Sequence, residues 1–214
     1  MEPTDFAPDR RRLLQGLIAA PVALLLGARL LAPGEAASAE ARVAAIEAGK
    51  RVAPTPACDD GDEPTPAQTE GPFFTPRSPT RASLIETGTK GTRIEIAGQV
   101  FGPGCKPLAG ALLDFWQADS EGEYDNEGFK LRGHQFTDGD GRYRLATIVP
   151  APYSGRTSHI HVKVQPKGGR VLTTQLYFPD EPQNRRDGGF RPELLVAPEK
   201  GSAPRRARFH FVLA

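Results

Sequence analysis

A short run of alternating β-branched residues places the strongest constraint on how this chain can fold. The run Ser158–Val164 reads Ser-His-Ile-His-Val-Lys-Val. Successive side chains of a strand point to opposite faces, so His159 and His161 share one face and three aliphatic side chains share the other. The run therefore predicts a strand with one apolar face and one face that carries two imidazoles.

Other runs of this kind follow along the chain, separated by turns rich in Gly, Pro and Asp. The 214-residue sequence contains 23 Gly and 21 Pro, which suits many short strands joined by frequent turns. The pattern predicts an all-β domain with a β-sandwich architecture. Strands are expected at residues 93–101, 111–117, 142–148, 158–165, 172–178 and 207–213.

Two imidazoles on one strand face can chelate a metal ion, although a His-x-His run taken alone is often a solvated strand face. Tyr153 and Arg156 precede the run in a loop with two prolines and a glycine, which makes that loop rigid. Phenolate is a hard anionic donor that suits ferric iron, whereas imidazole suits iron, zinc, copper and nickel alike. With Tyr124 as a second phenolate, the donor set favours ferric iron over zinc.

Four segments together resemble the intradiol ring-cleavage dioxygenases, a family that includes catechol 1,2-, hydroxyquinol 1,2- and protocatechuate 3,4-dioxygenases. Pro150–His161 resembles the family's signature, and Asp114–Tyr124 resembles the segment that ends in its first tyrosine ligand. Thr69–Phe74 resembles its entry segment, and Thr173–Phe178 resembles the segment with its active-site glutamine. The four segments occur in the family's order.

The resemblance implies ferric iron, one ion per chain, with Tyr124 and His161 as equatorial ligands and Tyr153 and His159 as axial ligands. A catechol would bind as a chelating dianion and displace Tyr153. Ring cleavage with O2 between the two hydroxylated carbons would give a cis,cis-muconate-type diacid. The implied partners are therefore a small aromatic diol and O2, and the implied process is the catabolism of aromatic compounds.

The same resemblance assigns roles to residues around the metal. Arg156 matches an arginine that stabilises the substrate anion, since a guanidinium keeps its charge. Gln175 matches a glutamine beside the site, and its amide can both donate and accept hydrogen bonds. Gly71, Pro72 and Phe73 are expected to line the substrate pocket. The alternative for Arg156 is a surface ion pair, and the alternative for Gln175 is a strand-edge position. For residues 71–73 the alternative is a turn packed against the sandwich.

Two other classes of function stay open. A transthyretin-like β-sandwich module binds ligands or serves as a scaffold without a metal, and several turns in this sequence are similar to the turns of such modules. A periplasmic copper binder would use only His159 and His161. A plain sandwich module has no reason to hold the four proposed ligands together with Arg156, so this full set favours the enzyme. The loop between Tyr153 and His159 is shorter than in protocatechuate dioxygenases, which leaves the particular catechol open.

The N-terminal segment predicts export to the periplasm or the extracellular space. Arg10–Arg12 precede an apolar run from Leu17 to Ala28 that is too short to span a bilayer comfortably. Ala37–Ala39 offers a small-residue cleavage site, after which no stable membrane span is expected. An uncleaved anchor and an ordinary secretory signal are the alternatives. The expected boundaries are 1–39 for a twin-arginine-type signal peptide, 40–65 for a flexible tether and 66–214 for the intradiol dioxygenase β-sandwich.

Cysteine content and charge add two further expectations. Cys58 and Cys105 suit an oxidising compartment, and a disulfide between them would pin the tether to the sandwich. Two free thiols are the alternative. The formal net charge is +1, so nothing indicates a nucleic-acid partner. The oligomeric state stays open.

Overall fold

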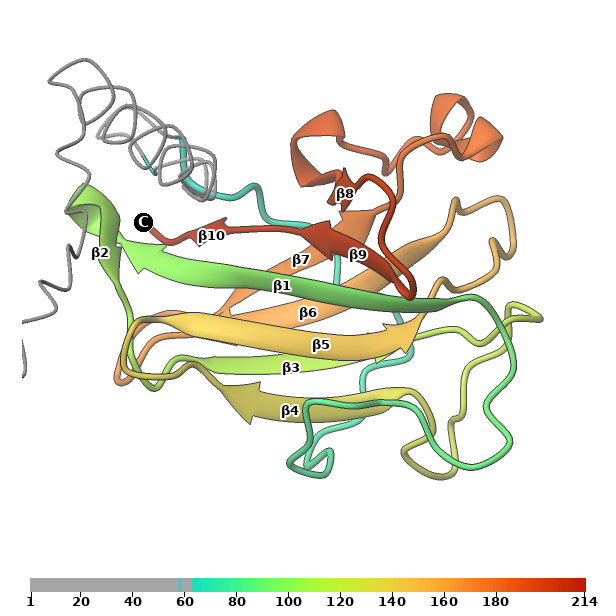
Figure 1. Ribbon diagram of the computed structural model, residues 1–214, viewed down its shortest axis with the longest axis horizontal. Coiled ribbons are helices and arrows are strands. Elements are labelled where there is room, and N and C mark those ends of the chain that lie inside the picture. Colours follow the sequence, from blue (N-terminus) through green and yellow to red (C-terminus); the bar gives the residue numbers. More distant parts are fainter. Residues whose placement is uncertain (1–57, 59–62) are drawn as a thin grey trace, which may run out of the picture. The chain divides into compact units, whose positions relative to one another are not determined.

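The computed structural model describes Cys58 and residues 63–214, which contain two β-sheets (Figure 1). The expected all-β sandwich is confirmed. The expected signal peptide at 1–39, and the expected tether apart from Cys58 and residues 63–65, lie outside the described residues. In the part of the chain that the structure describes, no helix has the length and hydrophobicity needed to cross a lipid bilayer.

The larger sheet is built around one long strand. Its six strands are β1 (Arg93–Gly102), β2 (Lys106–Pro107), β5 (Arg142–Ile148), β8 (Ala197–Glu199), β9 (Arg205–Arg208) and β10 (Phe211–Val212). β1 pairs in antiparallel fashion with β5 and β2, and in parallel fashion with β9 and β10. β8 pairs with β9 at the edge (Figure 1). Strand β1, which the sequence predicted at 93–101, is therefore hydrogen-bonded on both sides.

The second sheet has four strands in the order β4-β3-β6-β7, and all neighbours are antiparallel. These strands are β3 (Leu112–Gln117), β4 (Arg132–Phe136), β6 (His159–Gln165) and β7 (Leu172–Tyr177). Three short 3-10 helices lie in the connections, namely η1 (Pro103–Cys105), η2 (Pro182–Arg185) and η3 (Pro192–Leu194). β6 occupies an interior position of this sheet, so its two faces are well defined.

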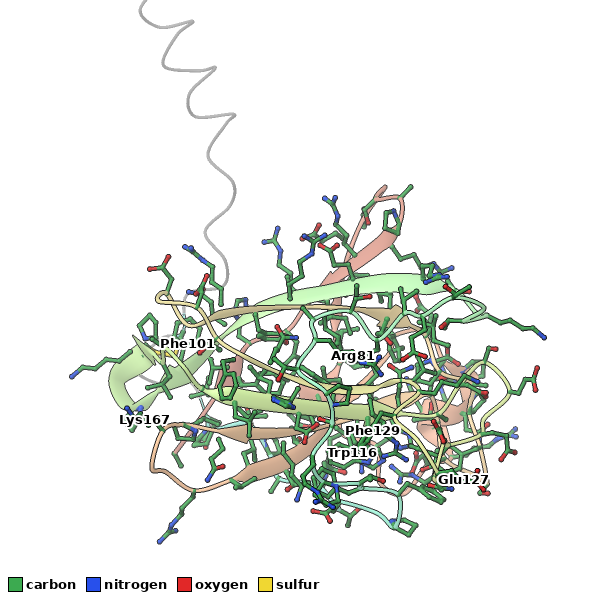
Figure 2. All side chains as sticks on the ribbon, turned by 90° about the horizontal axis from the view of Figure 1, so that it is seen from below. Arg81, Phe101, Trp116, Glu127, Phe129 and Lys167 are labelled. Carbon is green, nitrogen blue, oxygen red and sulfur yellow. A yellow bond between two sulfur atoms is a disulfide. The ribbon has the colours of Figure 1, made fainter. Side chains whose placement is uncertain are left out.

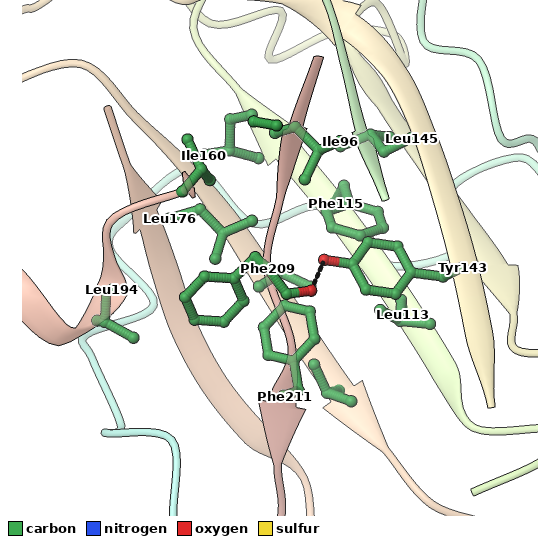
Figure 3. Packing of buried hydrophobic residues seen from close by; sticks show 14 of the residues in the cluster. Ile96, Leu113, Phe115, Tyr143, Leu145, Ile160, Leu176, Leu194, Phe209 and Phe211 are labelled. Atoms are coloured by element: carbon green, nitrogen blue, oxygen red, sulfur yellow. Dashed lines mark hydrogen bonds between the residues drawn. The ribbon is translucent and has the colours of Figure 1, made fainter. Parts of the chain in front are cut away.

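The core lies between the two sheets. Figure 3 shows Leu113, Ile160 and Leu176 of the second sheet packed with Ile96 and Leu145 of the first, and all five side chains are fully buried. The aliphatic residues of β6 therefore face inward, as the alternation predicted, and burial of such side chains is the main favourable contribution to folding. The two histidines of β6 are left on the opposite face of the sheet.

The expected strand at 207–213 is two shorter strands, β9 and β10. The ladder with β1 is interrupted at Phe209 and His210. The Nδ1 atom of His210, in place of a backbone carbonyl, accepts the N–H of Gln99 at 3.1 Å. Gly98 allows the chain to pass closely here, because a Cβ on it would lie only 1.7 Å from the carbonyl oxygen of Phe209.

A disulfide joins Cys58 to Cys105, with Cα atoms 5.4 Å apart. Thr65 forms two hydrogen bonds with strand β10 of the larger sheet. Its N–H donates to the carbonyl of Val212 at 2.9 Å, and its Oγ1 accepts the N–H of Val212 at 2.8 Å. These bonds fix the chain just before the segment that enters the candidate site.

Replacing both cysteines with serine is expected to lower the free energy of unfolding by up to about 4 kcal/mol, the value that chain entropy gives for a loop of this size. The bridge spans a sequence separation of 47 residues. Denaturant unfolding of the oxidised protein and of the double-serine variant measures the difference. A reducing agent should shift the unfolding midpoint of the parent protein and leave that of the variant unchanged. Equal midpoints for the two oxidised proteins would contradict the expectation.

Candidate metal centre

Two buried imidazoles face each other on β6. The Nε2 atoms of His159 and His161 are 3.1 Å apart. Nδ1 of His159 lies 2.6 Å from the carbonyl oxygen of Thr157. A carbonyl can only accept, so Nδ1 carries the proton and Nε2 keeps a lone pair, which is the form that binds metals. Burial lowers the pKa of His159 to about 4 and lowers the pKa of His161 well below its ordinary value. Both rings are therefore neutral at pH 7.

Strand pairing and a close glycine fix the ring of His161. Trp116, labelled in Figure 2, lies opposite it on β3 and stacks on it with ring centroids 4.8 Å apart and planes 9° apart. Gly71 approaches from the entry segment, where a Cβ would lie 3.5 Å from Cε1 of His161. Gly71 has a φ of 71°, a conformation that strains any L side chain. The glycine therefore leaves room at the Nε2 edge of the imidazole.

Two tyrosines reach the imidazoles from separate loops. Tyr124 lies in the β3–β4 connection and Tyr153 in the β5–β6 connection. Their Oη atoms are 3.3 Å apart, and Oη of Tyr153 is 3.5 Å from Nε2 of His159. Burial, with the phenol of Tyr153 beside it, raises the pKa of Tyr124. This phenol therefore ionises near neutral pH only beside a cation.

Arg132 holds the Tyr124 loop, a role that no pattern in the sequence predicts. Its side chain is almost fully buried and lies over the Tyr124 ring, with Cζ 5.9 Å from the ring centroid. The guanidinium donates to the carbonyls of Asp125 at 2.9 Å and Phe73 at 2.5 Å. Phe73 in turn stacks on Tyr124, with centroids 4.4 Å apart. No sequence signal marks Arg132, because a charged residue at the start of a strand is usually solvated.

Arg156 and Gln175 meet in one hydrogen-bonded network. Nη2 of Arg156 donates to Oε1 of Gln175 at 2.7 Å, and Nε2 of Gln175 donates to the carbonyl of Thr69 at 2.9 Å. Nε of Arg156 lies 3.0 Å and 2.9 Å from the two carboxylate oxygens of Asp187. Gln175 is paired with His161 across β6 and β7, so the network adjoins the imidazoles.

Two members of this network, Asp187 and Tyr177, are not marked by any pattern in the sequence. Asp187 lies after η2 in an Arg-Arg-Asp-Gly-Gly run that reads as an ordinary turn. Tyr177 lies in a strand, where a tyrosine most often serves packing. Its Oη is 2.8 Å from both the carbonyl oxygen of Gly189 and Oε1 of Gln175, so its one proton is donated to one of these two acceptors. Burial raises the pKa of Tyr177 to about 12, so its hydroxyl remains a donor.

The residues singled out in the sequence therefore come together at one place. Two phenols and two imidazoles converge on one face of β6. A metal ion between the Nε2 atoms of His159 and His161 would replace the one proton that these two nitrogens can share. Two phenols can supply the negative charge that a hard cation needs. Among Cys58 and residues 63–214, no group of three or more His, Cys, Asp or Glu side chains is suited to a metal ion. Pro72 is exposed beside Gly71 and Phe73, and the disulfide lies at η1.

The described part of the chain is similar in sequence to known dioxygenases. Residues 69–213 match the family model Dioxygenase_C, described as "Dioxygenase". Catechol 1,2-dioxygenase 2 of Acinetobacter lwoffii is 32% identical over an alignment of 144 residues that covers 55% of this chain and 52% of the relative. Hydroxyquinol 1,2-dioxygenase of Rhizobium sp. (strain MTP-10005) is 30% identical over 167 residues, which cover 64% and 56%. The chain thus spans about half the length of the curated relatives it matches.

Two solved structures share the fold. The dioxygenase domain of a dioxygenase–carbohydrate-binding protein fusion from Streptomyces sp. SirexAA-E is 56% identical, with a TM-score of 0.68, over 71% of this chain and 98% of that domain. 3-Chlorocatechol 1,2-dioxygenase of Rhodococcus opacus 1CP is 25% identical, with a TM-score of 0.64, over 85% of this chain and 89% of that enzyme. Both the sequence and the fold therefore point to one group of enzymes.

Proposed function

The chain belongs to the intradiol ring-cleavage dioxygenase family, and we propose that it uses one ferric ion to cleave catechol-type rings between the two hydroxylated carbons. O2 is the second substrate, and the product is a cis,cis-muconate-type diacid. The observation that carries this proposal is the convergence of two phenols and two neutral imidazoles beside a fixed arginine. The relatives' names specify catechol, hydroxyquinol and chlorocatechol. We propose only this class of substrate, the catechol-type diols, for the present chain.

Each of the four donor residues has a defined part in holding the ion. Nε2 of His159 presents a lone pair because Thr157 takes the Nδ1 proton, and Trp116 keeps the plane of His161 fixed. Tyr124 and Tyr153 supply the anionic oxygens that a ferric ion prefers. When bound, ferric iron draws electron density from a chelated catechol and so opens the ring to attack by O2.

Tyr153 is the residue that can exchange with substrate. A catechol that binds through both oxygens must lose two protons, so a base has to accept them. In the described part of the chain, neighbouring rings meet the Tyr153 ring only edge-on or at an angle, whereas Tyr124 is stacked on Phe73 and covered by Arg132. Tyr153, leaving as the neutral phenol, would take one of the two protons, and a solvent hydroxide displaced with it would take the other. Tyr124 stays in place and keeps the ion bound during that exchange.

Tyr153→Phe should therefore retain iron but bind catechol slowly. Tyr124, His159 and His161 remain as ligands, while a base and one phenolate are lost. The visible charge-transfer band should shift, and stopped-flow mixing with catechol should show a rate reduced by about 10-fold or more, the scale of losing a positioned proton acceptor. An iron-free variant, or an unchanged binding rate, would contradict this role for Tyr153.

Oxygen uptake with catechol, hydroxyquinol and protocatechuate tests the proposed function and narrows the substrate. We expect purified wild-type protein to be burgundy from tyrosinate-to-iron charge transfer and to contain about one iron per chain, as four converging protein ligands imply. Uptake should accompany formation of a muconate-type product with at least one of the three diols. A colourless protein without iron and without oxygen uptake would favour a metal-free binding module. Bound copper would favour a copper-binding protein that uses His159 and His161.

A further inference from the structure

We propose that Asp187 is a positioning residue that fixes the Arg156 guanidinium so that only its Nη1 group is left to contact the substrate anion. This inference rests on the proposed function, because it assigns how the arginine of that site is held. Asp187 itself contacts none of the four candidate ligands, so its part is exerted through Arg156.

The carboxylate of Asp187 is fully engaged on the protein side. Its side chain is 2% exposed, and that of Arg156 is 27% exposed. Oδ2 accepts the N–H of Thr157 at 2.9 Å, and Oδ1 accepts the N–H of Gly189 at 2.8 Å. Both oxygens also lie within hydrogen-bond distance of Nε of Arg156. A carboxylate with these three donors has one orientation, and it sets the orientation of the guanidinium in turn.

The other end of the guanidinium is held as well. Nη2 donates to Gln175 at 2.7 Å and to the hydroxyl of Tyr177 at 3.3 Å. A guanidinium is planar, so fixing Nε and Nη2 fixes the whole group. Nη1 forms no hydrogen bond with any residue in the described part of the chain. Nη1 is therefore the nitrogen available to an anionic oxygen of the substrate.

The loop that carries Asp187 is itself tied to the strand entry. Asn184 of η2 accepts the hydroxyl of Thr157 at 2.7 Å and donates to the carbonyl of Phe178 at 2.9 Å. Residue 189 is a glycine, which leaves room for the guanidinium. A Cβ at this position would lie only 3.0 Å from Nη2 of Arg156. On the other side of Asp187, the carbonyl oxygen of Gly189 lies 2.8 Å from Oη of Tyr177. The carboxylate thus approaches the arginine from a loop held on both sides, as a positioning group requires.

An amide cannot replace this carboxylate. Asparagine at 187 has one acceptor oxygen and one NH2 group, and the NH2 would face Nε–H of Arg156 or a backbone N–H. The matched control is Glu199→Gln, the same change of carboxylate to amide in the Arg208–Glu199 ion pair of the larger sheet, whose atoms are 2.6 Å apart. That ion pair belongs to β8 and β9 and contacts none of the site residues.

The test is a double-mutant cycle with Asp187→Asn and Arg156→Ser on the iron-loaded protein. Asp187→Asn is expected to lower kcat for the best catechol by about 10- to 100-fold, the usual cost of an outer hydrogen-bond partner, with KM within about threefold. Iron content and the resting colour should match wild type, because the four ligands are intact. In the Arg156→Ser background the same change should alter kcat by less than about threefold, since Asp187 acts through Arg156. Glu199→Gln should behave as wild type.

Three outcomes of this cycle would overturn the inference. Asp187→Asn with kcat equal to the Glu199→Gln control would show that the carboxylate is not needed. Equal losses in both backgrounds would show that Asp187 does not act through Arg156. An inactive wild type would overturn the proposed function and this inference together, so the two failures are distinguishable. If Asp187→Asn does not fold, Arg156→Lys decides instead. Lysine keeps the positive charge and can still contact Asp187, but it lacks the planar guanidinium with its several N–H donors. Arg156→Lys should therefore lower kcat by at least about 10-fold. Full activity of this variant would overturn the inference.

Discussion

Replacing Arg156 with serine is expected to leave iron and catechol binding intact and to lower turnover by about 100-fold or more, the scale for losing one group that stabilises charge in the transition state. None of the four candidate ligands is hydrogen-bonded to this guanidinium, which is held by Asp187, Gln175 and Tyr177. The ring-opening step builds negative charge on oxygen, and serine cannot compensate it. Oxygen-uptake kinetics measure the loss, and the visible spectrum with catechol checks that substrate still binds.

A matched arginine separates this effect from a general loss of stability. Arg208→Ser removes the partner of Glu199 on the larger sheet, and we expect near wild-type turnover from it. Isolated pairs of this kind contribute at most about 1 kcal/mol to stability. Normal turnover in Arg156→Ser, with an active wild type, would show that the arginine has another role even though the family assignment stands.

Replacing Tyr124 with phenylalanine should have the largest effect on the metal. We expect iron affinity to fall by at least about 100-fold, since loss of partners outside the ligand shell alone costs 10- to 100-fold. Phe73 and Arg132 can still pack on the ring, so the loop should keep its shape while the oxygen donor is lost. Metal analysis after dialysis against a weak chelator measures the loss, and the burgundy colour should fade with it.

Tyr143 provides the matched control for a tyrosine-to-phenylalanine change. Its hydroxyl donates to the carbonyl of Phe209 at 3.0 Å inside the core (Figure 3). Tyr143→Phe should therefore cost about 1 kcal/mol in the free energy of unfolding, with iron content and colour unchanged. Retention of full iron by Tyr124→Phe would contradict the proposed ligand set.

Strands with one buried face could be predicted because burial of that face leaves a period of two in the sequence. β5 has the predicted bounds of 142–148, and β6 begins one residue later than predicted, at His159. Strand β4 was not predicted, because its sequence Arg-Gly-His-Gln-Phe is mostly polar and shows no apolar alternation. The conformation of β4 depends on its pairing with β3 in the folded protein. The sequence of β4 alone contains no information about that pairing.

The candidate site divides in the same way. His159 and His161 could be placed from spacing alone, because strand geometry puts positions i and i+2 on one face. Tyr124 and Tyr153 needed the family resemblance, since they come from different loops. Asp187 could not be predicted at all: it reaches Arg156 from 31 positions along the chain, through a contact that only the folded loop creates. Residues that position others leave weaker signals than residues with reactive groups.

The most direct measurement is a reaction of the iron-loaded protein with catechol under ¹⁸O2, followed by mass spectrometry of the product. Intradiol cleavage breaks the bond between the two hydroxylated carbons and adds one atom of O2 to each, so we expect cis,cis-muconate with one labelled oxygen in each new carboxyl group. The reaction should fail in protein stripped of iron and return when ferric iron is restored. An unlabelled product, a ring-opened aldehyde from cleavage beside the diol, or no reaction with any catechol would contradict the proposed function.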